Sequence, residues 1–454
     1  MHTIETFNRK ILLAAAAALA LVASLASFSP VAAQEKPKAH APAKTYAIRG
    51  VKIITLAGPA IDKGNIVIRD GRIVAIGADA AIPTDAEVLD ASGLEAYPGM
   101  FDSVDQIGLE EIGAVSATVD ARELGEFNPQ LQAATAVHPA SAHIPVTRAA
   151  GITHVLTSPA AGGFGGSSGV ILGQASVINL SGWTLDQMLV RRSAAMVINW
   201  PDFNTRSFDL STFSLKERPF ADAKKEYERK VQQLADFFEE ARHYQQAVAK
   251  GSAKNYVRDL KLEAMIPVLE GKLPVLILAD RAREIRGAVE FCDKQKIRMI
   301  LGSGSEAMKV ADLLKSKNIP VILGPTLRLS DNEDDPYDKF FTLPSDLQKA
   351  GIRFAIASYD LQFVRRLPQQ AGNAVAYGLS HDDGLKAVTL YPAQILGLDK
   401  DLGTLETGKI ANIMITNGDP LELRTEVKYL YIDGKPTSTD NKHKELYEKY
   451  IKRP

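Results

Sequence analysis

The feature that most constrains the fold is an alternation of apolar strands and charged helices between about residues 95 and 398. Such an alternation indicates a parallel sheet covered by helices, and about 300 residues of it are typical of a (β/α)8 TIM-type barrel. The longest helical pattern covers residues 221–248. A Rossmann-like sheet is the alternative, but the glycines of residues 161–169 lack the spacing of a dinucleotide-binding turn. The strand candidates are residues 152–158, 194–199, 273–279, 297–303, 319–324 and 352–358.

Two flanking segments, residues 45–97 and 401–438, have a different sequence pattern. They consist of short runs in which apolar and polar residues alternate. Each contains an Asp-Gly pair between two such runs, Asp70-Gly71 and Asp433-Gly434. This is the strongest short signal for a β-hairpin. We therefore expect the two segments to form one small β-sandwich domain, built from both ends of the mature chain. The barrel, residues 98–400, is inserted between its halves, and residues 439–454 form a charged C-terminal tail.

The first 33 residues have the pattern of a secretory signal peptide. Arg9 and Lys10 precede an apolar run over residues 11–25, and small residues lead up to Ala33. A run of about 15 residues is short for a membrane span, which needs about 20. We expect cleavage after Ala33, no stable membrane anchor and export to a bacterial periplasm, with an uncleaved N-terminal anchor as the alternative. Residues 34–44 are expected to be a linker.

The composition excludes several classes of function. The chain has 53 Lys and Arg against 54 Asp and Glu, a net charge of −1, so it has no electrostatic preference for nucleic acid or anionic membranes. Its single cysteine, Cys292, excludes an internal disulfide and a Cys-rich metal site. The function must therefore depend on other side chains.

Three stretches, residues 66–102, 273–314 and 385–422, resemble the amidohydrolase superfamily, in particular its imidazolonepropionase-like members. The resemblance implies hydrolysis of carbon–nitrogen bonds by one or two divalent metals at the C-terminal mouth of the barrel, where the metal lowers the pKa of a bound water to near 7. It also implies a set of ligands: His-x-His after the first strand, Lys or Glu on the fourth, and one His each on the fifth and sixth. An Asp after the last strand would move the proton.

This chain carries other residues at the positions that the resemblance assigns to the ligands. Val104 and Gln106 stand in place of His-x-His, Leu278 is on the fifth strand, Ser303 is on the sixth, and Met196 is near the fourth-strand position. Zinc-like metals prefer imidazole ligands, which these side chains do not supply. We therefore expect no metal and no cofactor.

The eight histidines contain no His-x-His or HExxH pair. His138 and His143 are the best remaining cluster, and we interpret each histidine on its own as structural or solvated.

Carboxylates are the other candidates at the barrel mouth. Asp360 matches the last-strand Asp and is the tentative catalytic residue, although the alignment one residue out selects Tyr359. Its structural alternative is to cap the following helix. Asp102 and Asp105 follow the first strand, where two carboxylates can bind a hard cation or share a proton for acid–base chemistry.

Two further charged residues belong to this set of candidates. Arg281 comes shortly after Leu278, which stands at the fifth-strand ligand position. There its guanidinium can bind an anion or pair with its neighbour Asp280. Glu306 follows the sixth strand, where it can hold a ligand or cap a helix.

Two functions remain. The first is a metal-depleted pseudoenzyme that binds a small molecule at the barrel mouth or supports an active relative. The alternative is an active hydrolase of carbon–nitrogen bonds in cyclic or peptide-like amides, which would use Asp360 with Asp102 and Asp105 or a displaced site for zinc or another divalent metal. The resemblance implies a homodimer or a heteromer with an active amidohydrolase.

Overall fold

The structure is a computed structural model that describes residues 44–159, 169–203, 205–209, 212–250, 258–330 and 332–453. The signal peptide expected over residues 1–33 lies outside this part of the chain, as do most of the linker and of the glycine-rich segment. No helix in the described ranges is long and apolar enough to cross a membrane.

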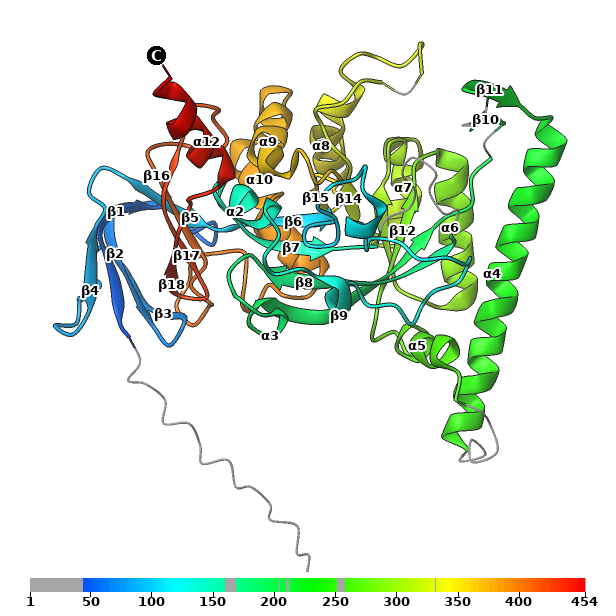
Figure 1. Ribbon diagram of the computed structural model, residues 1–454, viewed down its shortest axis with the longest axis horizontal. Helices are drawn as coiled ribbons and strands as arrows, with labels where there is room; N and C mark the ends of the chain where they lie inside the picture. The colour runs from blue at the N-terminus through cyan, green and yellow to red at the C-terminus, as the bar shows by residue number, and fades with distance from the viewer. Residues whose placement is uncertain are drawn as a thin grey trace, which may run out of the picture. The chain divides into compact units, whose positions relative to one another are not determined.

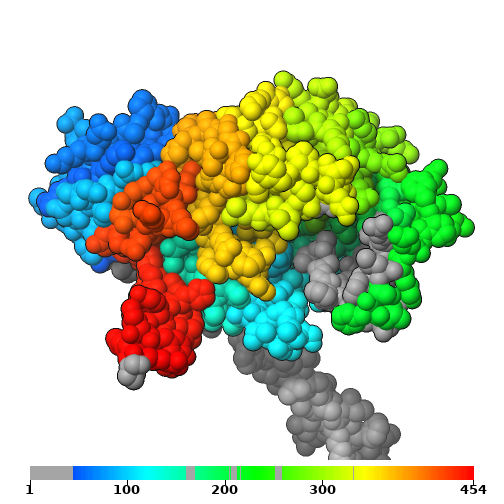
Figure 2. All heavy atoms as spheres, turned by 90° about the horizontal axis from the view of Figure 1, so that it is seen from above, coloured from blue at the N-terminus to red at the C-terminus, as the bar shows by residue number. Residues whose placement is uncertain are grey.

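Strands from both ends of the chain share one eight-stranded sheet. Its order is β18-β17-β16-β5-β1-β2-β3, with β4 pairing a second part of β1. Figures 1 and 2 both show the N-terminal segment, in blue, beside the orange and red C-terminal segment. The two-layered sandwich form stays a prediction. The strands are β1 (Tyr46–Ile53), β2 (Ile61–Arg69), β3 (Arg72–Gly77), β4 (Glu87–Asp90), β5 (Glu95–Pro98), β16 (Ile413–Thr416), β17 (Val427–Ile432) and β18 (Lys435–Thr437).

The two Asp-Gly pairs form the turns predicted for them. Asp70 and Gly71 join β2 to β3, and Asp433 and Gly434 join β17 to β18, all four with positive φ. The turns also touch each other, because a Cβ on Gly434 would lie 2.5 Å from the Cα of Gly71. Local turn chemistry thus brings the two ends of the chain together.

The second large sheet is a nearly closed barrel of eight strands. Its order is β15-β14-β13-β12-β9-β8-β7-β6, and the Tyr359 amide, just beyond β15, donates to the carbonyl of Val104 in β6. All neighbouring pairs are parallel except those of β8, which is antiparallel to β7 and β9. The expectation of an all-parallel barrel is therefore wrong at β8. The strands are β6 (Met100–Asp105), β7 (Ile152–Thr157), β8 (Ile171–Asn179), β9 (Leu189–Asn199), β12 (Val275–Ala279), β13 (Met299–Ser303), β14 (Val321–Leu323) and β15 (Phe354–Ile356).

Helices pack on the outside of this barrel, and the longest, α4, confirms the helix predicted over residues 221–248. A short hairpin of β10 (Arg206–Asp209) and β11 (Ser214–Glu217) precedes it. The helices are α2 (His143–Arg148), α3 (Leu185–Met188), α4 (Phe220–Ala249), α5 (Leu260–Leu269), α6 (Ala282–Gln295), α7 (Ala311–Ser316), α8 (Lys339–Ala350), α9 (Leu367–Ala376), α10 (His381–Lys386), α11 (Leu390–Ile395) and α12 (Lys442–Ile451).

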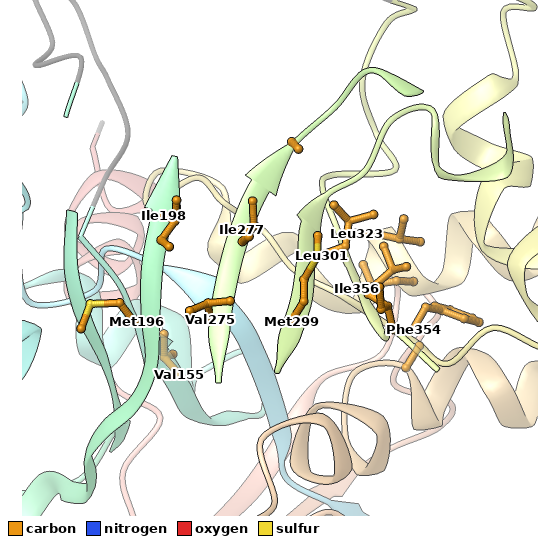
Figure 3. Packing of buried hydrophobic residues seen from close by; sticks show 14 of the residues in the cluster. Val155, Met196, Ile198, Val275, Ile277, Met299, Leu301, Leu323, Phe354 and Ile356 are labelled. Atoms are coloured by element: carbon orange, nitrogen blue, oxygen red, sulfur yellow. The ribbon is translucent and has the colours of Figure 1, made fainter. Parts of the chain in front are cut away.

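Alternate residues of each barrel strand enter two different cores. In β12, Val275 and Ile277 pack outward against the helices, in the cluster drawn in Figure 3, whereas Leu276 belongs to a separate inner cluster and Leu278 packs against it. Strand geometry requires this, since successive side chains point to opposite faces. The alternation decides which side chains can reach the mouth of the barrel.

Candidate site at the barrel mouth

A pocket of about 440 Å³ opens at the carboxyl ends of β9, β12 and β13 and beside Tyr359 after β15. This is the end of a TIM-type barrel at which enzymes of the fold place their sites, and the volume suits a small organic molecule. The lining combines apolar side chains with charged side chains of both signs. The lining residues are Val170, Asn199, Trp200, Pro201, Asp202, Lys230, Leu278, Ala279, Asp280, Arg281, Glu284, Ser303 and Tyr359.

Tyr359 and two apolar residues fill the space beneath this pocket. Val104 belongs to the inner cluster, and Leu278 and Tyr359, which are partly buried, pack against it. The Tyr359 hydroxyl accepts a hydrogen bond from the Ser303 amide at 2.9 Å and donates one to the Ile322 carbonyl at 3.0 Å. Both hydrogen-bonding roles of the phenol are thus used inside the barrel, and burial raises its pKa further above the usual range.

We call Val104, Leu278 and Tyr359 the plug, and the packing around it is tight. A Cβ on Gly302 would lie 2.7 Å from Leu278 Cδ2 and 3.1 Å from the Tyr359 hydroxyl. Ser303 and Tyr359 both have positive φ, 68° and 51°, which is uncommon for residues other than glycine. The backbone at both strand ends is held in an unfavourable conformation that places the Ser303 amide on the phenol.

Asp280 is the most firmly positioned carboxylate in the pocket. Its Oδ1 accepts from the Ser303 hydroxyl at 2.6 Å, from the Ser305 amide at 3.1 Å and from the Ser305 hydroxyl. Sequence reasoning considered Asp280 only as a partner of Arg281. Its place directly after a barrel strand was the available signal, because the carboxyl ends of the strands build the site.

Asp102 and Asp105 come together as predicted, but inside the protein. Both are 0% exposed, and the Ser358 hydroxyl lies between them, 2.7 Å from Asp105 Oδ2 and in contact with Asp102 Oδ2. The Ser358 amide also donates to Asp102 Oδ1 at 3.0 Å. Burial raises the pKa of both carboxyls, and the charge of Asp102 raises that of Asp105 further. Sequence reasoning missed Ser358.

The structure contradicts the predicted position of Met196 and shows where Gln106 lies. Met196 packs in the outer core and pairs in register with Val275, so its predicted place at the mouth is wrong, because β9 turns this side chain toward the helices. Asn199, three residues on, lines the pocket instead. Gln106 is half-buried, and its carbonyl accepts from the Leu109 amide.

The three remaining charged candidates occupy different surroundings. Arg281 is exposed and lines the pocket. Glu306 accepts from the Ala282 amide at 2.8 Å and so caps the start of α6, the helix before it rather than the helix after it. The Asp360 carboxylate accepts from the Gln362 amide at 2.8 Å, a local turn bond, and its catalytic role stays a prediction.

No histidine of the described ranges lines this pocket. His143 Nε2 bonds the Glu111 carbonyl at 3.0 Å, and His381 Nε2 lies 2.6 Å from an oxygen of Asp419. His138 is exposed. His154 is buried beside Phe101, its Nδ1 lies 2.9 Å from the Thr153 hydroxyl, and burial lowers its pKa to about 3.

The side chains present do not fit the metal that the amidohydrolase resemblance implies. Val104 and Leu278 offer no lone pair, and the phenol of Tyr359 is already bonded on both sides. Across the ranges that the structure describes, no three His, Cys, Asp or Glu residues are grouped as metal ligands would be. Among the described residues, the side chains at these positions are therefore unsuited to hold such a metal.

Comparisons with known proteins agree on the fold. The sequence pattern of the amidohydrolase family matches residues 280–439. An amidohydrolase from Thermotoga maritima MSB8 has a similar structure, with a TM-score of 0.74 and 24% identity over 87% of this chain and 99% of that one. A prolidase complexed with N-methylphosphonate-L-proline has a TM-score of 0.53 and 16% identity over 87% of this chain and 100% of that one. Such likenesses show the fold alone.

One curated relative, the amidohydrolase TasK of Hapsidospora irregularis, is 22% identical over 400 residues. The match covers 82% of this chain but 39% of the relative, so the chain spans about two-fifths of that protein. Residues 280–439 thus match the amidohydrolase family, and the nearly closed barrel is consistent with the fold of the similar solved structures. The imidazolonepropionase-like subtype stays a prediction.

Proposed function

We propose that this protein is a metal-free member of the amidohydrolase superfamily that binds a small molecule in the pocket at the barrel mouth. The observation that supports the proposal is the plug of Val104, Leu278 and Tyr359, which pack together in the inner cluster, at or beside positions for which the amidohydrolase resemblance implies metal ligands or the catalytic Asp. An open pocket of about 440 Å³ remains above the plug, and its lining is polar enough to orient a ligand.

The geometry gives less support to the alternative of a hydrolase based on three carboxylates. Asp102 and Asp105 are 0% exposed, so a substrate in the pocket cannot touch them. Asp360 is half-buried and does not line the pocket. A metal-independent reaction by this set would need the barrel to open, since general acid–base chemistry requires hydrogen-bond reach to the substrate.

The proposal is tested by assaying the purified full chain for ammonia or amine release from dipeptides, N-acyl amino acids and cyclic amides, with and without added Zn²⁺ or Mn²⁺. We expect no release above the buffer rate and no rise of the melting temperature with either metal. Turnover that copurifies with the protein and is lost in D280N would overturn the proposal.

Export and partner subunits are proposals as well. We propose that the chain is secreted and cleaved after Ala33, which N-terminal sequencing of the protein recovered from its native cell envelope tests directly. A first residue other than Gln34 would contradict the cleavage site. The mass of the purified assembly distinguishes a homodimer from a heteromer.

A further inference from the structure

We infer that the pocket recognises an amino-acid-like zwitterion, with the ligand's ammonium group on Asp280 and its carboxylate on the Arg281 side. The inference rests on the proposed function, because it names the ligand of the same pocket. It depends on three features of the lining: a half-buried carboxylate held by neutral donors, cationic side chains and apolar side chains.

The first feature is the way in which Asp280 is held. The three hydrogen-bond donors on its Oδ1 come from Ser303 and Ser305, and all of them are neutral. Neutral donors fix the orientation of the carboxylate but leave its negative charge in place. A half-buried charge of this kind is best satisfied by a cation that also donates hydrogen bonds, as a primary ammonium does.

The second feature is that cations are also present in the same lining. Lys230 and Arg281 contribute positive charge, while Asp202 and Glu284 join Asp280 as carboxyl groups. Burial raises the pKa of Glu284, and its Oε2 is already used by the Arg281 amide at 3.2 Å. A lining with both signs of charge favours a ligand with both signs, and a guanidinium is suited to a carboxylate because it can donate two parallel hydrogen bonds.

The third feature is the presence of three apolar side chains, Val170, Trp200 and Leu278, in the same lining. An aliphatic side chain placed there would be removed from water, which favours binding. The pocket therefore fits a ligand with an ammonium group, a carboxylate and an apolar side chain, of the size of an amino acid or a dipeptide.

Three related probes separate the charges of such a ligand. L-Leucine carries both charges, L-leucine amide carries only the ammonium, and N-acetyl-L-leucine carries only the carboxylate. Binding is measured by calorimetry and by tryptophan fluorescence in W183F. The chain has two tryptophans, so in this variant Trp200 in the pocket is the only reporter, and Trp183 is 92% exposed and dispensable for packing.

We expect L-leucine and L-leucine amide to bind and to change the Trp200 emission, and N-acetyl-L-leucine to bind at least about tenfold more weakly, as expected for loss of a hydrogen bond to a charged group. D280N should weaken L-leucine and L-leucine amide about tenfold without affecting N-acetyl-L-leucine. R281Q should weaken L-leucine but not L-leucine amide. The matched control D62N, an exposed position in β2, should change none of the affinities.

The outcomes separate the two proposals. Preferred binding of N-acetyl-L-leucine, equal loss of all probes in D280N, or no binding of any probe at millimolar concentration would each overturn the zwitterion assignment. Release of ammonia from L-leucine amide by the wild-type chain would instead overturn the metal-free binding function while leaving recognition of the ammonium group intact.

Discussion

Replacing Asp105 by asparagine should remove the fall in the free energy of unfolding that the buried Asp102–Asp105 pair causes between pH 5 and pH 7. The Ser358 hydroxyl has one proton but contacts oxygens of both Asp102 and Asp105. One of the two contacts must therefore be donated by a carboxylic acid, so the folded protein holds a proton on this buried pair. Burial is the first cause of the raised pKa of both carboxyls, and a raised pKa also favours a bound proton on this pair.

The direction of the effect follows from proton linkage. In the unfolded chain these groups lose their protons near pH 3.9, whereas the folded chain keeps one at a higher pH. The pair's contribution is therefore fully present below the unfolded pKa and is lost as the pH rises through the folded pKa. The free energy of unfolding falls by about 1.4 kcal/mol per pH unit for each retained proton, or by about 2.7 kcal/mol from pH 5 to pH 7.

The amide of D105N can donate to the Ser358 hydroxyl without taking up a proton, and Asp105 Oδ1 has no hydrogen-bond partner to lose. We expect D105N to be at least as stable as the wild type at pH 7 and to lack this slope, as measured by urea denaturation at pH 5, 6 and 7. S358A is the comparison variant, and it should cost about 2–4 kcal/mol at every pH because two buried carboxyls lose a partner. A D105N variant with the wild-type slope and a loss of more than about 2 kcal/mol at pH 7 would refute the shared proton.

Three further substitutions test other parts of the structure. E306A should cost about 1 kcal/mol, because the Ala282 amide at the start of α6 loses its acceptor, and E306Q should recover most of it in urea denaturation. D360N should change stability by less than about 0.5 kcal/mol and leave ligand affinity unaltered, since its turn bond survives as an amide; a large loss of affinity would restore Asp360 to the site. The depressed pKa of His154, caused by burial, means that this residue's contribution to stability falls as the pH drops from about 6.5 toward 3, by about 1.4 kcal/mol per unit, which is measured as the difference between the wild type and H154Q. H154Q should lack that loss. If the stability of H154Q falls below pH 6.5 as steeply as that of the wild type, the imidazole is not held neutral by burial.

Much of the fold could be predicted because its signals are local. The Asp-Gly turns depend on two residues that tolerate positive φ, and both turns form. The apolar strands of the barrel, from β12 to β15, follow from short runs bounded by charged helices. Strand β8 was missed because its direction depends on antiparallel pairing with β7 and β9, and an apolar run carries no sign of its direction.

The candidate site was predicted less completely, for physical reasons that differ between residues. Met196 was misplaced because a shift of one residue along a strand exchanges its two faces, and the sequence does not fix the register of β9. Leu278 and Ser303 line the pocket because they lie near the carboxyl ends of two clearly defined strands, β12 and β13. The bonds of Ser358 to Asp102, and of Tyr359 to Ile322, join residues far apart in the chain, and only the closed barrel brings them together.

The central claim is that the barrel mouth has exchanged metal ligands for an apolar plug. The most direct test is the metal content per chain, measured by elemental analysis on protein purified without chelator and again after incubation with Zn²⁺ or Mn²⁺ and gel filtration. The plug of Val104, Leu278 and Tyr359 predicts a content far below one metal ion per chain in both samples. A content of about one transition-metal ion per chain, retained through gel filtration, would contradict it.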